Sequence, residues 1–160
     1  MFMHQQQADP DPSPAQVREL VLAQHRELRD LLHKAEKATA WEGEPSFQRA
    51  EHLIHISEEL YARFENHLRF EEHLMFPALR DADVWGEERV AALTKEHAQQ
   101  RHDLEEFIDL VDSECPPEEL RRALEALSRL LLEDIEEEED ACLDADLLRD
   151  DVVAIDQVSG

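Results

Sequence analysis

The chain has 160 residues, of which 42% are apolar, 40 are acidic and only 16 are basic. This length suffices for one domain with a substantial core and is too short for two ordinary domains. The formal net charge of −24 argues against electrostatic binding of nucleic acid or of an anionic membrane surface. We attribute the charge to solubility.

Targeting signals and cysteine pairs are not evident in the sequence. No apolar run reaches the roughly 18 residues that a transmembrane helix needs, and the first residues lack the basic and apolar regions of a secretory signal. The two cysteines, Cys115 and Cys142, do not form a CxxC motif. We therefore expect a reduced, cytoplasmic protein that does not enter a membrane.

The first half of the chain predicts a lead-in and two helices. Residues 1–14, with consecutive glutamines and several prolines, are typical of a disordered segment. Ser13 and Pro14 suit the N-cap and N1 positions of a helix that runs to about Thr39. After a loop at residues 41–46, the second helix spans about 47–76 and ends near Pro77.

The second half repeats this plan. A connection that contains Trp85 and Gly86 precedes a third helix over about 87–112, and prolines 116 and 117 break the chain before a fourth helix over about 117–141. Four amphipathic helices with short loops predict an all-α fold, an antiparallel up-and-down four-helix bundle over residues 15–148. Residues 149–160 lack helical periodicity and form a short irregular C-terminal tail, which either lies along the bundle or extends free.

The apolar face of the second helix contains two polar residues. At helical spacing its members are Leu53, Ile56, Leu60, Phe64, His67, Glu71, Leu74 and Ala78. Burying an ionised carboxylate without a partner costs several kcal/mol or more, so a compensating charge is expected near Glu71.

Each of the other helices also has a metal-ligand type of residue within its apolar stripe. The full set of candidate ligands is His25, His67, Glu71, His97, Asp134 and Glu138. The two pairs with i, i+4 spacing place both side chains on one helix face. A His-x-x-x-Arg pattern at His25 and again at His97 indicates two related helix hairpins, which would bring the six groups to one level of the core.

Three imidazoles and three carboxylates in one core layer need counter-charge. Each could instead be an ordinary buried polar residue satisfied by a neighbour, but six coincident groups favour a pair of divalent or trivalent cations. Mixed nitrogen and oxygen ligands suit iron, manganese or zinc better than calcium, and the lack of thiolates argues against a structural zinc site.

At these residues the sequence resembles the hemerythrin-like, or HHE cation-binding, domains. The match consists of His25, residues 67–72 followed by Leu-Met-Phe-Pro at 74–77, the pair Glu96-His97, and the pair Glu138-Glu139. The resemblance covers about residues 15–148 and implies two iron ions bridged by carboxylates and an oxo or hydroxo group, with manganese or zinc as possible substitutes. It also implies a small ligand, O2, NO or peroxide.

The chain departs from the family pattern at Asp134, where the family has a histidine on its fourth helix. The aspartate could supply an oxygen ligand in its place, or a water could fill the position, or the second metal could bind weakly. Isolated histidines such as His73 and His102 are expected on the surface or beside the ligands rather than among them. Arg29 and Arg101 are either partners of the carboxylates or surface charges, and we slightly favour the surface interpretation.

Three functions compete on these residues. The first is a non-haem di-iron protein that binds or senses dioxygen, NO or peroxide, with an apolar wall to which Leu28, Leu60, Phe64 and Leu93 could contribute. The second is a di-iron oxidase or peroxidase, because carboxylate ligands stabilise higher oxidation states. The third is an iron-storage or iron-responsive protein. We expect a stand-alone binding or sensing domain rather than an enzyme.

Overall fold

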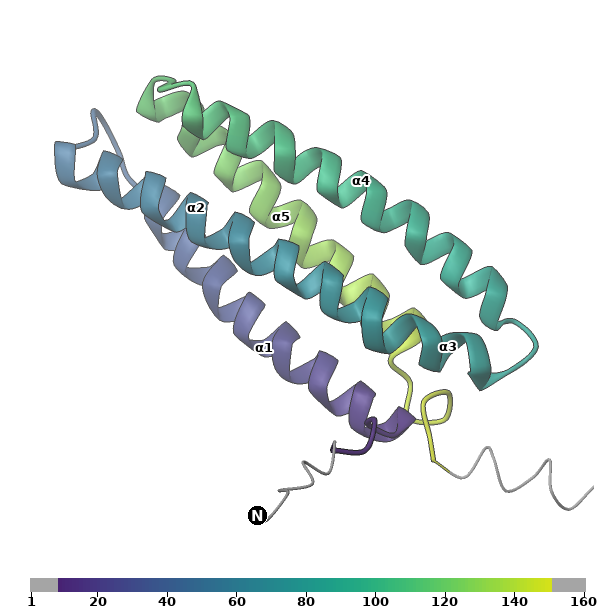
Figure 1. Ribbon diagram of the computed structural model, residues 1–160. Helices are drawn as coiled ribbons and strands as arrows, with labels where there is room; N and C mark the ends of the chain where they lie inside the picture. Colours follow the sequence, from purple (N-terminus) through teal and green to yellow (C-terminus); the bar gives the residue numbers. More distant parts are fainter. Residues whose placement is uncertain (1–8, 151–160) are drawn as a thin grey trace, which may run out of the picture.

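Residues 9–150 are described in a computed structural model, and they form a bundle of antiparallel helices (Figure 1). In chain order the elements are α1 (Pro14–Thr39), α2 (Phe47–Phe70), η1 (Glu71–Met75), α3 (Phe76–Ala82), α4 (Gly86–Asp112) and α5 (Pro117–Cys142). The segments α2, η1 and α3 follow one another without a break and make one long rod. The predicted all-α four-helix bundle is therefore confirmed.

The beginnings of the first two helices follow from local capping chemistry. The hydroxyl of Ser13 accepts a hydrogen bond from the backbone N–H of Gln16, whose side chain accepts one from the backbone of Ser13, and Pro14 occupies the first turn. Ser46 caps α2 in the same way through the backbone N–H of Arg49. Both helices begin where the sequence predicts.

The predicted end of the second helix near Pro77 is wrong, because the rod continues to Ala82. A π-helical turn, η1, precedes the proline, and the backbone N–H of Phe76 donates to the carbonyl of Glu71, five residues earlier. In a regular α-helix the proline ring would clash with the carbonyl four residues before it, and the wider turn relieves that clash. The chain reverses only at residues 83–85.

The extra residue of the π turn also shifts the buried face of the rod. The predicted stripe continues from Glu71 to Leu74 and Ala78, which are only partly buried, whereas Met75 and Leu79 are fully enclosed. A turn of α-helix has 3.6 residues, so one inserted residue moves every later side chain by about 100° around the axis. After the turn, the residue that faces the core is therefore the next one along the chain.

Two apolar clusters fill the bundle, one on each side of a polar layer. The larger cluster includes Leu32, Leu60 and Leu131, and the smaller one includes Val21 and Met75. On every long rod, the polar candidate residue lies in sequence between members of the two clusters. The polar layer is therefore sealed by apolar side chains along the bundle axis in both directions.

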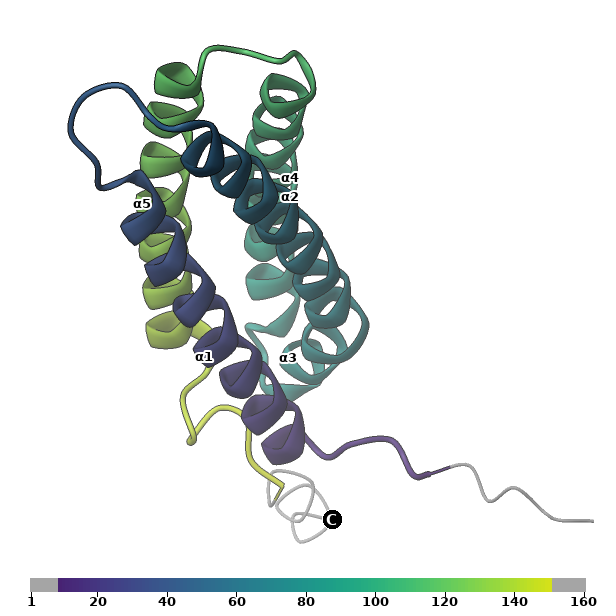
Figure 2. The same ribbon diagram turned by 90° about the vertical axis from the view of Figure 1, so that its left-hand side faces the viewer.

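The chain after α5 packs against the beginning of α1. Leu143 and Leu148 are buried, and the carboxylate of Asp150 accepts hydrogen bonds from the Ser13 hydroxyl and the Ala15 N–H. Figure 2 shows this segment beside the N-terminal end of α1. Residues 1–8 and 151–160, which hold most of the predicted lead-in and tail, lie outside the described residues. Within residues 9–150, no helix is both long and apolar enough to cross a membrane.

Candidate metal centre

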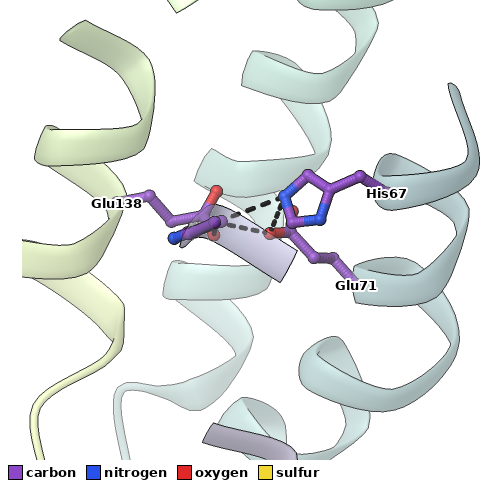
Figure 3. Close-up of side chains that lie close together, drawn as sticks. His67, Glu71 and Glu138 are labelled. Carbon is purple, nitrogen blue, oxygen red and sulfur yellow. Dashed lines mark hydrogen bonds and ion pairs between the residues drawn. The ribbon is translucent and has the colours of Figure 1, made fainter. Parts of the chain in front are cut away.

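Five of the six predicted ligands meet in the middle of the bundle. His25 comes from α1, His67 from the end of α2, Glu71 from the first position of η1, His97 from α4 and Glu138 from α5. All five side chains are buried, Glu71 completely. Figure 3 shows Glu138 pointing from its helix toward His67 and Glu71 on the facing rod.

Glu71 lies between imidazole nitrogens of three histidines, two near one carboxylate oxygen and one near the other. Its Oε1 is 2.6 Å from Nε2 of His67 and 3.3 Å from Nε2 of His25, while its Oε2 is 3.0 Å from Nε2 of His97. Glu138 Oε1 is 3.4 Å from Nε2 of His25. One ligand atom from each of His25, His67, Glu71 and Glu138 lies within 4.8 Å of the other three. The carboxylate of Glu71 is therefore placed to bridge two positions.

Without a cation, protons must supply the missing charge. Burial by itself lowers the pKa of His25, but its contacts with Glu138 and Glu71 raise that pKa to about 10. Burial and the adjacent charge of Glu71 raise the pKa of Glu138 well above its ordinary value. Burial would raise the pKa of Glu71 too, yet the facing imidazoles hold it well below its usual range. A cation that entered this layer would displace protons.

Each of the three histidines also has a partner for its outer nitrogen. Nδ1 of His25 lies 3.1 Å from Glu139, Nδ1 of His67 lies 2.8 Å from the amide oxygen of Gln24, and Nδ1 of His97 lies 3.0 Å from Glu72. An N–H that donates to these oxygens leaves the lone pair on Nε2, which faces the centre of the cluster. This arrangement is typical of metal-bound histidines.

Two arginines hold the outer carboxylates in place. Arg29 donates to both oxygens of Glu139, at 2.8 and 2.6 Å, and Arg101 donates to both oxygens of Glu72, at 2.5 and 2.9 Å. These forked pairs lower the pKa of both carboxylates. The surface interpretation of the two arginines is wrong, because each makes a forked ion pair with the carboxylate that contacts a histidine.

Sequence reasoning did not identify Gln24, Glu72 or Glu139 as parts of the site. A signal for the two glutamates was present in the repeated Glu-Glu doublets at 71–72 and 138–139. In each doublet the first residue points to the core and the second reaches a histidine on another helix. The amide of Gln24 had no comparable signal, since a single glutamine on an exposed helix face is common.

Asp134 is the predicted ligand that the structure leaves out of the cluster. It is half-buried, and its carboxylate accepts a hydrogen bond of 3.0 Å from the Gln100 amide. The inward position at this level belongs to Ile135, which is 3% exposed, because burying an aliphatic side chain is favourable and burying a carboxylate is costly. Its predicted place on the core stripe is therefore wrong, and its role as a ligand stays a prediction.

Buried ligand atoms without hydrogen bonds indicate that the cluster fits a bound cation. Three buried ligand atoms, Glu71 Oε2, His97 Nε2 and Glu138 Oε1, have no hydrogen-bond partner among the described residues. Unpaired buried polar atoms are rare in folded proteins because each costs about 1–3 kcal/mol. Glu71 Oε2 and His97 Nε2 face each other at 3.0 Å without hydrogen-bond geometry, and Glu138 Oε1 lies 3.4 Å from Nε2 of His25, so cations bound beside these atoms would satisfy them. Five histidines away from the cluster are exposed, as expected: His33, His52, His55, His73 and His102.

The fold and the cluster together define a helical-bundle protein with a histidine and carboxylate site for metal cations. The family comparison agrees with that class: residues 16–145 match the hemerythrin HHE cation-binding domain. The chain belongs to this family. Comparison with curated proteins and with solved structures gave no match. The resemblance inferred from the residues is thereby confirmed, and so is the general function of cation binding.

Proposed function

We propose that this protein binds two iron ions in the polar layer of its bundle and uses them to bind or sense dioxygen, NO or peroxide. The observation that carries the proposal is the position of Glu71, whose Oε1 faces His25 and His67 and whose Oε2 faces His97. A carboxylate placed in this way suits a pair of ions better than a single one. Mixed imidazole and carboxylate ligands suit iron, with manganese or zinc as substitutes.

The residues divide naturally between two positions. His25, His67, Glu138 and one oxygen of Glu71 would hold the first ion, and His97 with the other oxygen of Glu71 would hold the second. The second position has fewer ligands from the described cluster, which leaves room for an external ligand. Iron would supply the redox chemistry and the affinity for a small diatomic ligand.

The surrounding side chains would orient the ligands and exclude water. The Phe64 and His67 rings pack edge to face with their centres 6.4 Å apart, and Phe76 lies against His97 with its ring centre 4.9 Å away. Leu28, Leu60 and Leu93 are buried in the two apolar clusters on either side of this layer. A dry apolar wall favours reversible binding because it keeps water and protons away from a reactive ligand.

A second candidate function is oxidation or peroxidation at the same metals. The observation that favours it is the carboxylate content of the site, with Glu71 and Glu138 in the cluster and an aspartate where the family has a fourth-helix histidine. Carboxylates stabilise the higher oxidation states that such enzymes use. Iron storage or iron sensing remains the third candidate.

Metal analysis and absorption spectra of purified, iron-reconstituted protein test the first proposal. We expect about two iron ions per chain, near-ultraviolet charge-transfer bands in air, and a reversible spectral change on removing and returning oxygen. His25→Ala should lose these bands, whereas the matched control His33→Ala, an exposed histidine on the same helix, should keep them. Steady turnover of peroxide or of a reduced substrate would favour the enzyme instead. A protein without stoichiometric metal would refute both.

A further inference from the structure

The end of the bundle that carries the α1–α2 loop has a pocket of about 350 Å³ whose lining includes two lysines, an arginine and a histidine. Lys34 and Lys37 come from the last turns of α1, and Arg49 and His52 come from the first turns of α2. The indole of Trp41 forms part of the wall. Along α1 this pocket lies roughly 14–18 Å from the level of His25, so it is separate from the metal centre.

These four side chains have no acidic partner within residues 9–150. None of the four takes part in an ion pair among the described residues, although the whole chain has 40 acidic side chains and only three lysines. Of the acidic residues near these positions in sequence, Glu36 and Glu42 line the neighbouring pocket on the α5 side, and Glu51, next to His52, does not line this pocket. Two of the three lysines of a strongly acidic protein therefore gather with an arginine around one pocket.

Helix stability explains the positions of the two lysines but not that of Arg49. Lysines near the C-terminal end of α1 interact favourably with the partial negative charge of that helix end. Arg49 lies in the first turn of α2, where the helix end is partially positive and a cation is unfavourable, and no acidic residue is present in that turn. The N-terminal end of α2 thus adds to the positive charge of Arg49, whereas the two lysines offset the partial negative charge at the end of α1.

We propose that this pocket binds a small oxyanion with two or more negative charges, either a phosphate ester or a polycarboxylate. Its charged groups would contact Lys34, Lys37 and Arg49, and its carbon skeleton would lie against the indole of Trp41. The net charge of the protein does not prevent this, because at physiological ionic strength charges more than about 8 Å away are largely screened. The inference is independent of the identity of the metal.

Trp41 provides the measurement. The chain has two tryptophans, and Trp85 lies in the α3–α4 connection, at the opposite end of the bundle from the α1–α2 loop (Figure 1). In full-length protein with Trp85→Phe, the fluorescence therefore reports on Trp41 alone. Titration with ribose 5-phosphate and, separately, with tricarballylate should give a saturable change with a dissociation constant below about 1 mM in dilute buffer. Tighter binding of ribose 5-phosphate would indicate a phosphate ester as the ligand, and tighter binding of tricarballylate would indicate a polycarboxylate.

Matched variants separate a site from a general charge effect. Lys37→Gln should weaken binding about threefold or more, and Lys34→Gln with Lys37→Gln about tenfold. Lys95→Gln removes the same charge from an exposed position on α4 and should leave the titration unchanged. Equal weakening by Lys95→Gln would overturn the proposal, as would the absence of any saturable change with either anion up to about 10 mM. Circular dichroism confirms that each variant is folded.

Discussion

Replacement of Glu71 by glutamine tests whether the negative charge of this side chain stabilises the polar layer and binds metal. The substitution keeps the shape of the side chain and removes its negative charge from a position that is 0% exposed. In the metal-free protein, the imidazolium of His25 would then retain only Glu138 as a close buried carboxylate. We therefore expect a loss of stability in the presence of a chelator as well as a loss of metal.

The pKa of His25 bounds the size of the effect. A rise from 6.5 to about 10 contributes at most about 4 kcal/mol to the free energy of unfolding at pH 7. Glu71 and Glu138 share this contribution, so Glu71→Gln should cost about 2–4 kcal/mol. For a chain of this length, each kcal/mol lowers the melting temperature by about 2–4 °C, which gives a fall of about 5–15 °C.

The pH dependence distinguishes this explanation from a simple packing defect. Because the folded-state pKa of His25 is raised, its stabilising contribution is fully present below about pH 6.5 and is lost as the pH rises toward about 10. Metal-free wild-type protein should therefore become less stable over that range. Glu71→Gln should show a shallower decline, because the variant has already lost part of the contribution.

Thermal unfolding followed by circular dichroism, in chelator at several pH values, measures these differences. Glu58→Gln is the matched control, since it removes the same charge from an exposed position on α2 and should change the melting temperature by less than about 2 °C. Iron analysis of the reconstituted variants forms the second measurement, with less than one ion per chain expected for Glu71→Gln. If Glu71→Gln melted and bound iron like Glu58→Gln, the reasoning about this layer would be refuted.

Three further predictions concern residues around the centre. If Asp134 is a ligand, Asp134→Ala should lose one of the two metals or bind it more weakly. Asp134→His should strengthen binding of azide. Unchanged iron content and absorption spectrum in Asp134→Ala would show that Asp134 is not a ligand. Arg101→Met should weaken metal affinity about 10–100-fold in competition with a chelator, because it releases the Glu72 carboxylate, which orients His97. A change in melting temperature alone would indicate a merely structural role. In alkylation at pH 8, Cys115 should react faster than Cys142. Burial raises the pKa of both thiols, but Cys142 is buried with a pKa raised to about 12, whereas Cys115 is half-buried. Equal rates for the two thiols in native protein would contradict this.

The sequence determined the helices and most of the site because both depend on local patterns. Helical periodicity, with the Ser13 cap and the prolines that break the chain, places the helix beginnings within a residue or two of the observed ones. His25, His67 and His97 are evident as polar residues on otherwise apolar faces, and the structure brings them together. A polar residue at a core position conflicts with the hydrophobic pattern, and that conflict can be read without coordinates.

Only the tertiary structure decided the features that depend on several helices at once. The π turn at Glu71–Met75 moves the buried face by one residue, and no periodicity rule anticipates an inserted residue. The forked pairs of Arg29 and Arg101 join residues far apart in the chain, so their role needs the helices in register. Whether Asp134 or Ile135 faces the core depends on a rotation of α5 by one residue, and packing against the other helices favours the aliphatic side chain.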